Sequence, residues 1–67
     1  MNQTVRNFVQ ELRIKNKITQ EELAQAVGVT RQTIIAVEKG NYTPSVLLAL
    51  KIAGFFKTTV EKLFTIQ

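Results

Sequence analysis

Polar side chains that could recognise DNA bases are grouped in the stretch TQEELAQAVGVTRQTIIAVEKG, from Thr19 to Gly40. Arg31 and Gln32 are adjacent in this stretch, and Gln20 precedes them. An arginine side chain can donate two hydrogen bonds to guanine, and a glutamine amide can pair in a similar way with adenine. The stretch therefore favours a surface that reads DNA, although a helical hairpin whose polar face meets only water has the same spacing.

Catalytic chemistry has little support in the rest of the chain. None of the 67 residues is a cysteine or a histidine, so the usual thiolate and imidazole metal ligands and the usual general base are absent. Glu21 and Glu22 are adjacent, and neighbours on a helix point about 100° apart, so they do not suit an acid/base pair. We expect no enzyme, no metal or cofactor site and no small-molecule ligand.

The chain is basic, with nine Lys and Arg against five acidic residues and a net charge of +4. This excess suits a polyanionic partner such as nucleic acid, although many domains without such a partner are equally basic. The longest apolar run, Val46 to Leu50, is much shorter than the ~18 residues of a membrane-spanning helix. We expect one domain, residues 1–67, in a cytoplasmic protein that binds no membrane.

Hydrophobic spacing and capping residues predict five helices in an all-α fold. The first helix is expected from Val5 to Lys15, where apolar residues recur at helical spacing. The next two are expected at 19–28 and 30–40, each with a threonine cap at its start and a glycine at its end. The last two are expected at 45–56 and 58–63, with Thr58 and Glu61 as a capping box. The final residues, LFTIQ, could leave the bundle as a short extended segment.

The two central helices match the pattern of a helix-turn-helix. Ala24 is small enough to let them approach each other, and Gly28 suits a turn that needs a positive φ. Val29, Ile34 and Val37 are expected to anchor the second of these helices on the core. Its outer side then carries four side chains expected to contact bases: Arg31, Gln32, Thr33 and Ile35.

The stretch LRIKNKITQEELAQAVGVTRQTIIAVEKGNYTPSVLLALKIAGFF, with the later TTVEKLF, resembles the helix-turn-helix family of Cro-type phage repressors and xenobiotic-response-element regulators. The similarity covers Leu12 to Phe64 and is specific as a set of motifs. It is strongest to short stand-alone members from bacteria, their phages and some archaea. The resemblance implies a lambda-repressor-like five-helix domain whose third helix lies in the DNA major groove. It also implies a nucleoid-associated protein of a prokaryote or phage.

The same resemblance implies roles for individual residues. The side chains expected to contact phosphates are Thr19, Gln20, Thr30, Lys39, Asn41, Tyr42 and Thr43. Arg13 and Glu38 match a pair that the family often uses as an internal salt bridge, and we expect this structural role here. Many short members carry a polar residue at the position of Ile35. This isoleucine could pack on a thymine methyl group, or it could turn partly inward beside Ile34.

The helix expected at 45–56 is more apolar than one buried face requires. Its expected core residues are Val46, Ala49, Leu50, Ala53 and Phe56, which leaves Leu47, Leu48 and Phe55 as surplus beside the mid-helix Gly54. The residues expected to form a dimer interface are Leu47, Phe55, Phe64 and Ile66, because exposed apolar patches mark contacts. The alternative is a core that wraps further around this helix. In short members of the family the chain ends can form a small β-sheet, and the MNQT and FTIQ segments could do so here.

Together these features predict a homodimeric, sequence-specific regulator of transcription that binds double-stranded DNA. Its simplest form is a repressor on an inverted-repeat operator. The surplus apolar surface allows a different reading, a protein-interaction module such as an antitoxin-like partner of another protein. A well-defined homodimer would favour the regulator, whereas a monomer that associates nonspecifically would favour the interaction module.

Overall fold

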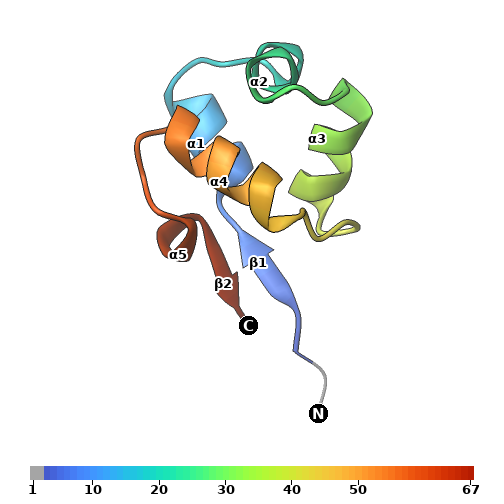
Figure 1. The fold of residues 1–67 in the computed structure, drawn as a ribbon, viewed down its shortest axis with the longest axis vertical. Coiled ribbons are helices and arrows are strands. Elements are labelled where there is room, and N and C mark those ends of the chain that lie inside the picture. Colours follow the sequence, from blue (N-terminus) through green and yellow to red (C-terminus); the bar gives the residue numbers. More distant parts are fainter. Residues whose placement is uncertain (1–2) are drawn as a thin grey trace.

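The computed structural model describes residues 3–67 of the chain. Its helices are α1 (Val9–Lys15), α2 (Gln20–Val27), α3 (Arg31–Lys39), α4 (Val46–Phe55) and α5 (Val60–Leu63), and its strands are β1 (Val5–Asn7) and β2 (Phe64–Ile66). In Figure 1, α4 lies near the centre with α2 above it, α3 to one side, and the strands and chain ends below. The predicted five-helix fold is confirmed, and it includes a small sheet. Within the described residues, no helix is both long enough and apolar enough to cross a membrane.

Capping residues set the ends of the two central helices as predicted. The Thr19 hydroxyl accepts a hydrogen bond from Glu22 N at 3.0 Å, and the Glu22 carboxylate accepts one from Thr19 N at 2.8 Å. This reciprocal capping box satisfies N–H groups that the start of a helix leaves unpaired. At the other end of α2, Gly28 adopts a φ of 77°, a left-handed conformation that is ~1–2 kcal/mol less favourable for residues with a β-carbon. Gly40 ends α3 in the same way.

The prediction that the first helix begins at Val5 is wrong. Residues Val5–Asn7 form β1, and α1 begins only at Val9. The Asn7 side chain explains this boundary, because its Oδ1 accepts a hydrogen bond from Val9 N at 3.2 Å. Its Nδ2 donates to Val37 O at 2.8 Å, which ties the start of α1 to α3. The helical spacing between Val5 and Val9 is therefore coincidental, and the polar side chain between them sets the boundary.

The two chain ends pair as an antiparallel sheet, as the resemblance implied, but the N-terminal strand is β1 at Val5–Asn7 and not the expected MNQT segment. Val5 lies opposite Ile66, and Asn7 lies opposite Phe64. Backbone hydrogen bonds also join Thr4 and Gln67 just beyond the strands. The role expected for the MNQT segment falls partly on residues 1–2, which lie outside the described residues. The sheet lies on one side of the helices (Figure 1).

The predicted capping box at the start of the last helix is also wrong. Thr59, and not Thr58, caps α5 by accepting a hydrogen bond from Lys62 N at 3.3 Å. Thr58 instead donates its backbone N–H to Ala53 O at 2.9 Å, which closes the end of α4. Lys57, just before it, adopts a positive φ of 57°. The sequence has no glycine at this tight turn that would predict it. The turn moves the N-terminal cap of α5 from Thr58 to Thr59.

The hydrophobic core forms among α2, α3 and α4, with contributions from α1 and α5. Its fully buried side chains are Val9, Leu23, Ile34, Val37, Ile52 and Leu63. The prediction for α4 is partly wrong, because Val46 and Leu50 are 77% and 55% exposed, whereas Leu48 is buried. Ala49 and Ala53 are buried as predicted, and Phe56 packs half-buried against the core. α4 is apolar around most of its circumference, so periodicity could not identify its inward face.

Candidate nucleic-acid interface

α2 and α3 meet in the helix-turn-helix arrangement that the sequence predicts. The Val29 N–H donates to Ala24 O at 3.0 Å across the turn, and the Ala24 side chain is buried. The helices therefore pack around a small residue, with left-handed Gly28 at the turn, as expected. Ile34 and Val37 are fully buried and fix the inner side of α3 on the core. The opposite side of α3 faces away from the protein.

The four side chains expected to contact bases differ in their exposure. Arg31 and Gln32 are exposed at the first turn of α3. Thr33 is half-buried, and its hydroxyl lies 3.2 Å from the hydroxyl of Thr30, the residue that caps α3. Ile35 is also half-buried, so it is neither fully outward nor part of the closed core. Arg31 and Gln32 are thus the most accessible of the four.

The residues expected to contact phosphates lie on both sides of these side chains. Thr19 and Thr30 occupy the N-terminal caps of α2 and α3. Lys39 is exposed in the last turn of α3, and the loop that follows exposes Asn41, Tyr42 and Thr43. These positions are compatible with contacts to a DNA backbone, and the contacts themselves stay predictions.

A largely buried ion pair connects α1 to α3 behind this surface. Arg13 donates to Glu38 Oε2 from Nε at 2.7 Å and to Glu38 Oε1 from Nη2 at 3.1 Å. Its remaining nitrogen, Nη1, donates to Ile18 O at 3.0 Å. The two side chains are 12% and 4% exposed, so good geometry compensates for charges that are mostly removed from water. The structural pair implied by the resemblance is present.

Gln20 links this ion pair to the exposed side of α3. Its Nε2 donates to Glu38 Oε1 at 3.1 Å, and its Oε1 accepts from Arg31 Nε at 3.4 Å. Both ends of the amide therefore bind within the chain, whereas the resemblance implied a side chain that binds a phosphate. Sequence reasoning missed this link because Gln20 lies on α2 and both of its partners lie on α3, so no local spacing rule connects them.

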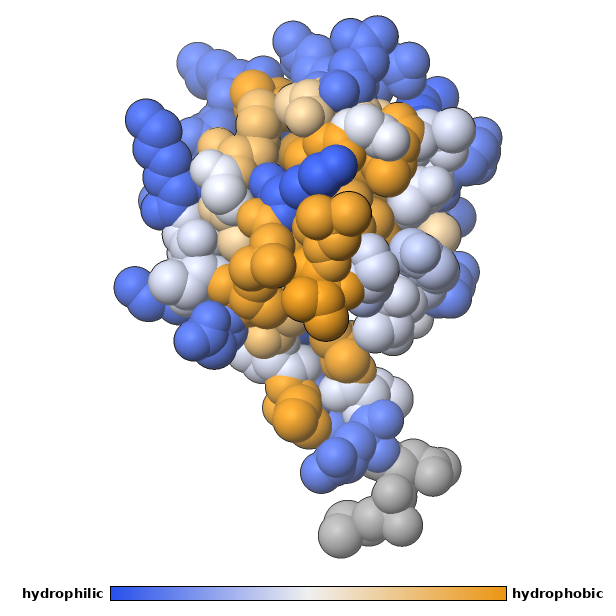
Figure 2. Space-filling model, viewed as in Figure 1, coloured by the Kyte–Doolittle hydropathy of each residue, from blue (hydrophilic) through white to orange (hydrophobic). Residues whose placement is uncertain are grey.

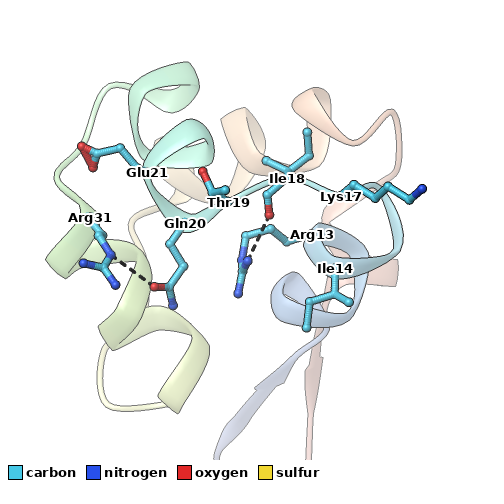
Figure 3. Close-up of a pocket in the computed structure, with 8 residues that line it drawn as sticks. All are labelled: Arg13, Ile14, Lys17, Ile18, Thr19, Gln20, Glu21 and Arg31. Carbon is cyan, nitrogen blue, oxygen red and sulfur yellow. Dashed lines mark hydrogen bonds between the residues drawn. The ribbon is translucent and has the colours of Figure 1, made fainter.

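An open depression of about 980 Å³ lies beside Gln20. Its lining, shown in Figure 3, comprises Arg13, Ile14, Lys17, Ile18, Thr19, Gln20, Glu21 and Arg31. Arg13 is neutralised by Glu38, and of the remaining charged side chains Lys17 and Arg31 are basic and Glu21 is acidic, so the depression favours an anion. Sequence reasoning did not single out Lys17, which has a φ of 58° in the turn between α1 and α2. A lysine gives no sequence signal for that left-handed conformation.

Glu22 has a shifted pKa at the start of α2. Hydrogen bonds with Thr19, first through its backbone and then through its side chain, lower the pKa of Glu22 from the ordinary value of 4.5. The carboxylate thus remains charged near neutral pH. A negative charge in the first turn is favourable for the helix dipole, so it stabilises the helix that carries Gln20.

A second exposed surface lies on α4 and near the chain end. We call it the apolar patch, and its members, Val46, Leu47, Leu50, Phe55 and Ile66, are between 39% and 77% exposed. Figure 2 shows orange surface at the centre of the face, where α4 lies, and more orange below it. Phe64, which was expected in this surface, is instead half-buried against the core. Gly54 is exposed on the same helix, and a β-carbon built there meets no described atom within 4 Å.

The chain is similar to known proteins in family pattern, in sequence and in fold. The family model HTH_3, described as Helix-turn-helix, matches residues 9–63. The chain is 49% identical over 63 residues to the uncharacterized HTH-type transcriptional regulator YgzD of Bacillus subtilis. The aligned region covers 94% of this chain and 96% of YgzD. The chain is also 33% identical over 55 residues to the cryptic phage CTXphi transcriptional repressor RstR of Vibrio cholerae. This aligned region covers 82% of this chain and 50% of RstR. Its fold is similar to that of the restriction-modification controller protein C.AhdI of Aeromonas hydrophila, with a TM-score of 0.75, 30% identity, and coverage of 81% of this chain and 82% of that one.

Proposed function

The chain belongs to the HTH_3 family of helix-turn-helix regulators of the xenobiotic-response-element type, and on this basis we propose that it is a homodimeric repressor of transcription. The family and the fold are those of DNA-binding regulators and not of enzymes. One observation carries the proposal: Arg31 and Gln32 are exposed at the first turn of a helix that Ile34 and Val37 fix to the core. In the proposed complex, α3 lies in the major groove of the operator.

Arg31 and Gln32 read the edges of base pairs. The guanidinium of Arg31 suits the two acceptors of guanine, and the amide of Gln32 suits the donor and acceptor of adenine. Each such bidentate contact contributes about 1–3 kcal/mol of discrimination against a wrong base. Thr33 and the half-buried Ile35 extend the contact with the bases. At the edge of this contact, Ile35 packs on a thymine methyl group.

Groups on both sides of α3 hold the DNA backbone. The first turn of α2 lines the depression of Figure 3, where the nearby positive charge of Lys17 favours a phosphate. On the other side, Lys39 and the exposed loop residues Asn41, Tyr42 and Thr43 contact further phosphates. Thr19 and Thr30, at the two helix caps, complete this set. These contacts position α3 and carry no sequence information themselves.

The apolar patch joins two copies of the chain. Val46, Leu50 and Gly54 follow one another at intervals of four residues, so they form one ridge along α4. A glycine inside a helix is about 0.5–1 kcal/mol less favourable than alanine, and at Gly54 nothing within the described chain requires it. A second α4 crossing at Gly54 gives it a purpose, because a missing side chain lets two backbones approach closely. In a two-fold dimer of this kind, the two α3 helices meet major grooves about 34 Å apart on an inverted repeat.

Repression is the simplest action for such a dimer, because a bound dimer excludes other proteins from promoter DNA. The similarity to RstR, a named transcriptional repressor, supports this direction. Residues 1–67 act as one DNA-binding domain in this proposal, in the cytoplasm and on the nucleoid of a prokaryotic cell.

Selection of bound duplexes from a random pool tests the proposal. We expect an inverted repeat to emerge, with affinity that falls steeply as salt rises, because neutralised phosphates release counterions. A pool that remains random after repeated selection, at low and at physiological salt, would contradict sequence-specific binding.

The apolar patch also favours a second candidate, a protein-interaction module such as an antitoxin-like partner. In that case the five exposed apolar side chains bind a different protein. Light scattering across a range of concentrations separates the candidates. A dimer of defined mass that binds a selected duplex supports the regulator, whereas a self-associating monomer that selects no duplex supports the module.

A further inference from the structure

One side-chain hydrogen bond joins the terminal sheet to α3. Asn7, the last residue of β1, donates from Nδ2 to Val37 O at 2.8 Å, and its Oδ1 accepts from Val9 N at 3.2 Å. Within residues 3–67, no other hydrogen bond connects either strand to α3. The Asn7 side chain therefore links the two paired chain ends to the proposed reading helix.

The partners of Asn7 fix the orientation of its amide. A backbone carbonyl can only accept a hydrogen bond, so Val37 O requires the NH₂ group of the amide. A backbone N–H can only donate, so Val9 N requires the amide oxygen. A flipped amide would place two acceptors together and two donors together. Asn7 thus satisfies a donor at the start of α1 and an acceptor near the end of α3.

The carbonyl that Asn7 binds belongs to the C-terminal cap of α3. Val37 O also accepts from Gly40 N at 3.0 Å. Asn41 N donates to Ala36 O at 3.0 Å, and together these bonds close the helix through left-handed Gly40. Asn7 uses the second lone pair of the Val37 oxygen, so it holds the same turn from outside the helix. The loop that begins at this turn carries three residues proposed to hold phosphates: Asn41, Tyr42 and Thr43.

This loop has few other contacts with β1. A hollow of about 220 Å³ lies beside it, and its lining includes Val5 and Asn7 from β1 together with Gly40, Tyr42 and Thr43. Figure 1 shows β1 near the loop that follows α3. The loop side chains at 41–43 are exposed and form no hydrogen bond within residues 3–67. The Asn7 bond is therefore the polar contact that connects the start of this loop to the sheet.

We propose that Asn7 is a positioning residue for the DNA backbone. By holding Val37 O, it keeps the end of α3 and the loop at 41–43 in the arrangement that binds phosphates. Asn7 itself contacts no DNA in this account. A loop that is already held loses less conformational entropy when DNA binds. This inference rests on the proposed function, because it requires the loop to contact phosphates.

Asn7→Ser is the main test of this role. A serine hydroxyl can still accept from Val9 N at the start of α1, but it is too short to reach Val37 O. The affinity of the folded variant should fall about two- to tenfold, because the loop must be ordered when DNA binds. The fall should be equal for every duplex, since phosphate contacts carry no sequence information. Discrimination at the base pairs read by Arg31 and Gln32 should not change.

A second background checks that the effect passes through the loop. Asn41→Ala combined with Thr43→Ala removes two side chains proposed to contact phosphates. In this background, Asn7→Ser should lower affinity less than it does in the wild type. An undiminished loss would contradict the proposed route from Asn7 to the DNA backbone.

Thr59→Ala separates positioning from stability. Thr59 caps α5 through Lys62 N and forms no hydrogen bond with α3 within the described chain. Its loss should lower stability, as the loss of a cap does, and leave the affinity of the folded protein unchanged. Affinities are compared at concentrations at which each variant is folded and dimeric. An equal loss of affinity in Thr59→Ala and Asn7→Ser would overturn the positioning role.

Hydrogen exchange in the free protein tests the link without DNA. Asn41 N–H closes the end of α3 on Ala36 O, and Val29 N–H closes the end of α2 on Ala24 O in the same way. Asn7→Ser should speed exchange at Asn41 relative to Val29, because only α3 loses its outside contact. An unchanged ratio of the two exchange rates would overturn the link.

The DNA measurements separate this inference from the function on which it rests. Unchanged affinity of Asn7→Ser, or a loss confined to one base pair, would overturn the inference. In both cases the proposed function stands if Arg31→Ala and Gln32→Ala still remove base preferences. If the wild type selects no duplex, the proposed function fails and the inference fails with it.

Discussion

Arg13 and Glu38 form a bidentate ion pair between α1 and α3, with nitrogen–oxygen distances of 2.7 and 3.1 Å. Arg13 also donates to Ile18 O, in the segment that connects α1 to α2. One guanidinium therefore holds three parts of the domain in place behind the proposed reading helix. The Glu38 carboxylate that Arg13 neutralises is almost closed to solvent. Removing one partner should therefore change the free energy of unfolding by a different amount than removing both.

Arg13→Met should destabilise the domain by about 3–5 kcal/mol, because it leaves the Glu38 carboxylate buried without its charged partner. Such a loss is a large share of the stability of a small domain. Replacing both residues with methionine should destabilise it less, since no unpaired charge remains in the interior. Urea unfolding of both variants measures the difference. Equal stability of the single and double variants would contradict the prediction that the unpaired Glu38 carboxylate destabilises the domain.

Lys57→Gly should raise the free energy of unfolding by about 1 kcal/mol. Lys57 has a φ of 57°, which strains a residue with a β-carbon but not a glycine. Lys51→Gly is the matched control, because Lys51 is an exposed lysine inside α4, where glycine should lower stability by about 1 kcal/mol. Thermal or urea unfolding gives the sign of each change. A loss of stability in both variants would contradict the predicted strain.

The capping box at Glu22 should contribute to the pH dependence of stability. The pKa of Glu22 is lowered by its hydrogen bonds with Thr19, so the carboxylate stabilises the folded state when it is charged. This contribution is fully present above the ordinary value of 4.5 and is lost as pH falls through the lower pKa of the folded protein. Stability of Glu22→Gln should therefore decline less than that of the wild type as pH falls below 4.5. Urea unfolding at a series of pH values checks this, and parallel profiles would refute it.

Leu50→Gln should weaken dimer formation, since Leu50 is 55% exposed in the middle of the apolar patch. Ile14→Gln is the matched control, because Ile14 is 61% exposed but lies on α1, outside the patch. Sedimentation equilibrium should show a higher dissociation constant for Leu50→Gln and little change for Ile14→Gln. Operator affinity should also fall with Leu50→Gln, because one α3 alone covers one half-site. Equal effects of the two changes would argue against the patch as the dimer interface.

Local residue types predicted the central part of the fold well. Thr19 with Glu22, and the glycines at 28 and 40, act within a few residues of their own positions, so their effect is visible in the sequence. The same holds for Ala24 at the helix crossing. This part of the chain also carries the exposed Arg31 and Gln32, which is why the candidate reading face could be predicted before the fold was known.

Features that depend on distant partners were not predictable in the same way. β1 exists because it pairs with β2 at the other end of the chain, and the apolar spacing of Val5 concealed this. The inward face of α4 depends on which helices cover it, so Leu48 and Leu50 were assigned to the wrong sides. The contact of Gln20 with Glu38 and Arg31 likewise requires α2 and α3 to be packed against each other.

The most direct test of the account is the base preference of Arg31→Ala and Gln32→Ala on the selected duplex. Each variant should lose discrimination at one base pair per half-site, by a factor that corresponds to about 1–3 kcal/mol, and keep its preference elsewhere. Lys62→Ala, which removes an exposed positive charge on α5, is the control and should keep every preference. If folded Arg31→Ala and Gln32→Ala select the same duplex as the wild type, with unchanged discrimination at every position, α3 does not read the operator through these side chains.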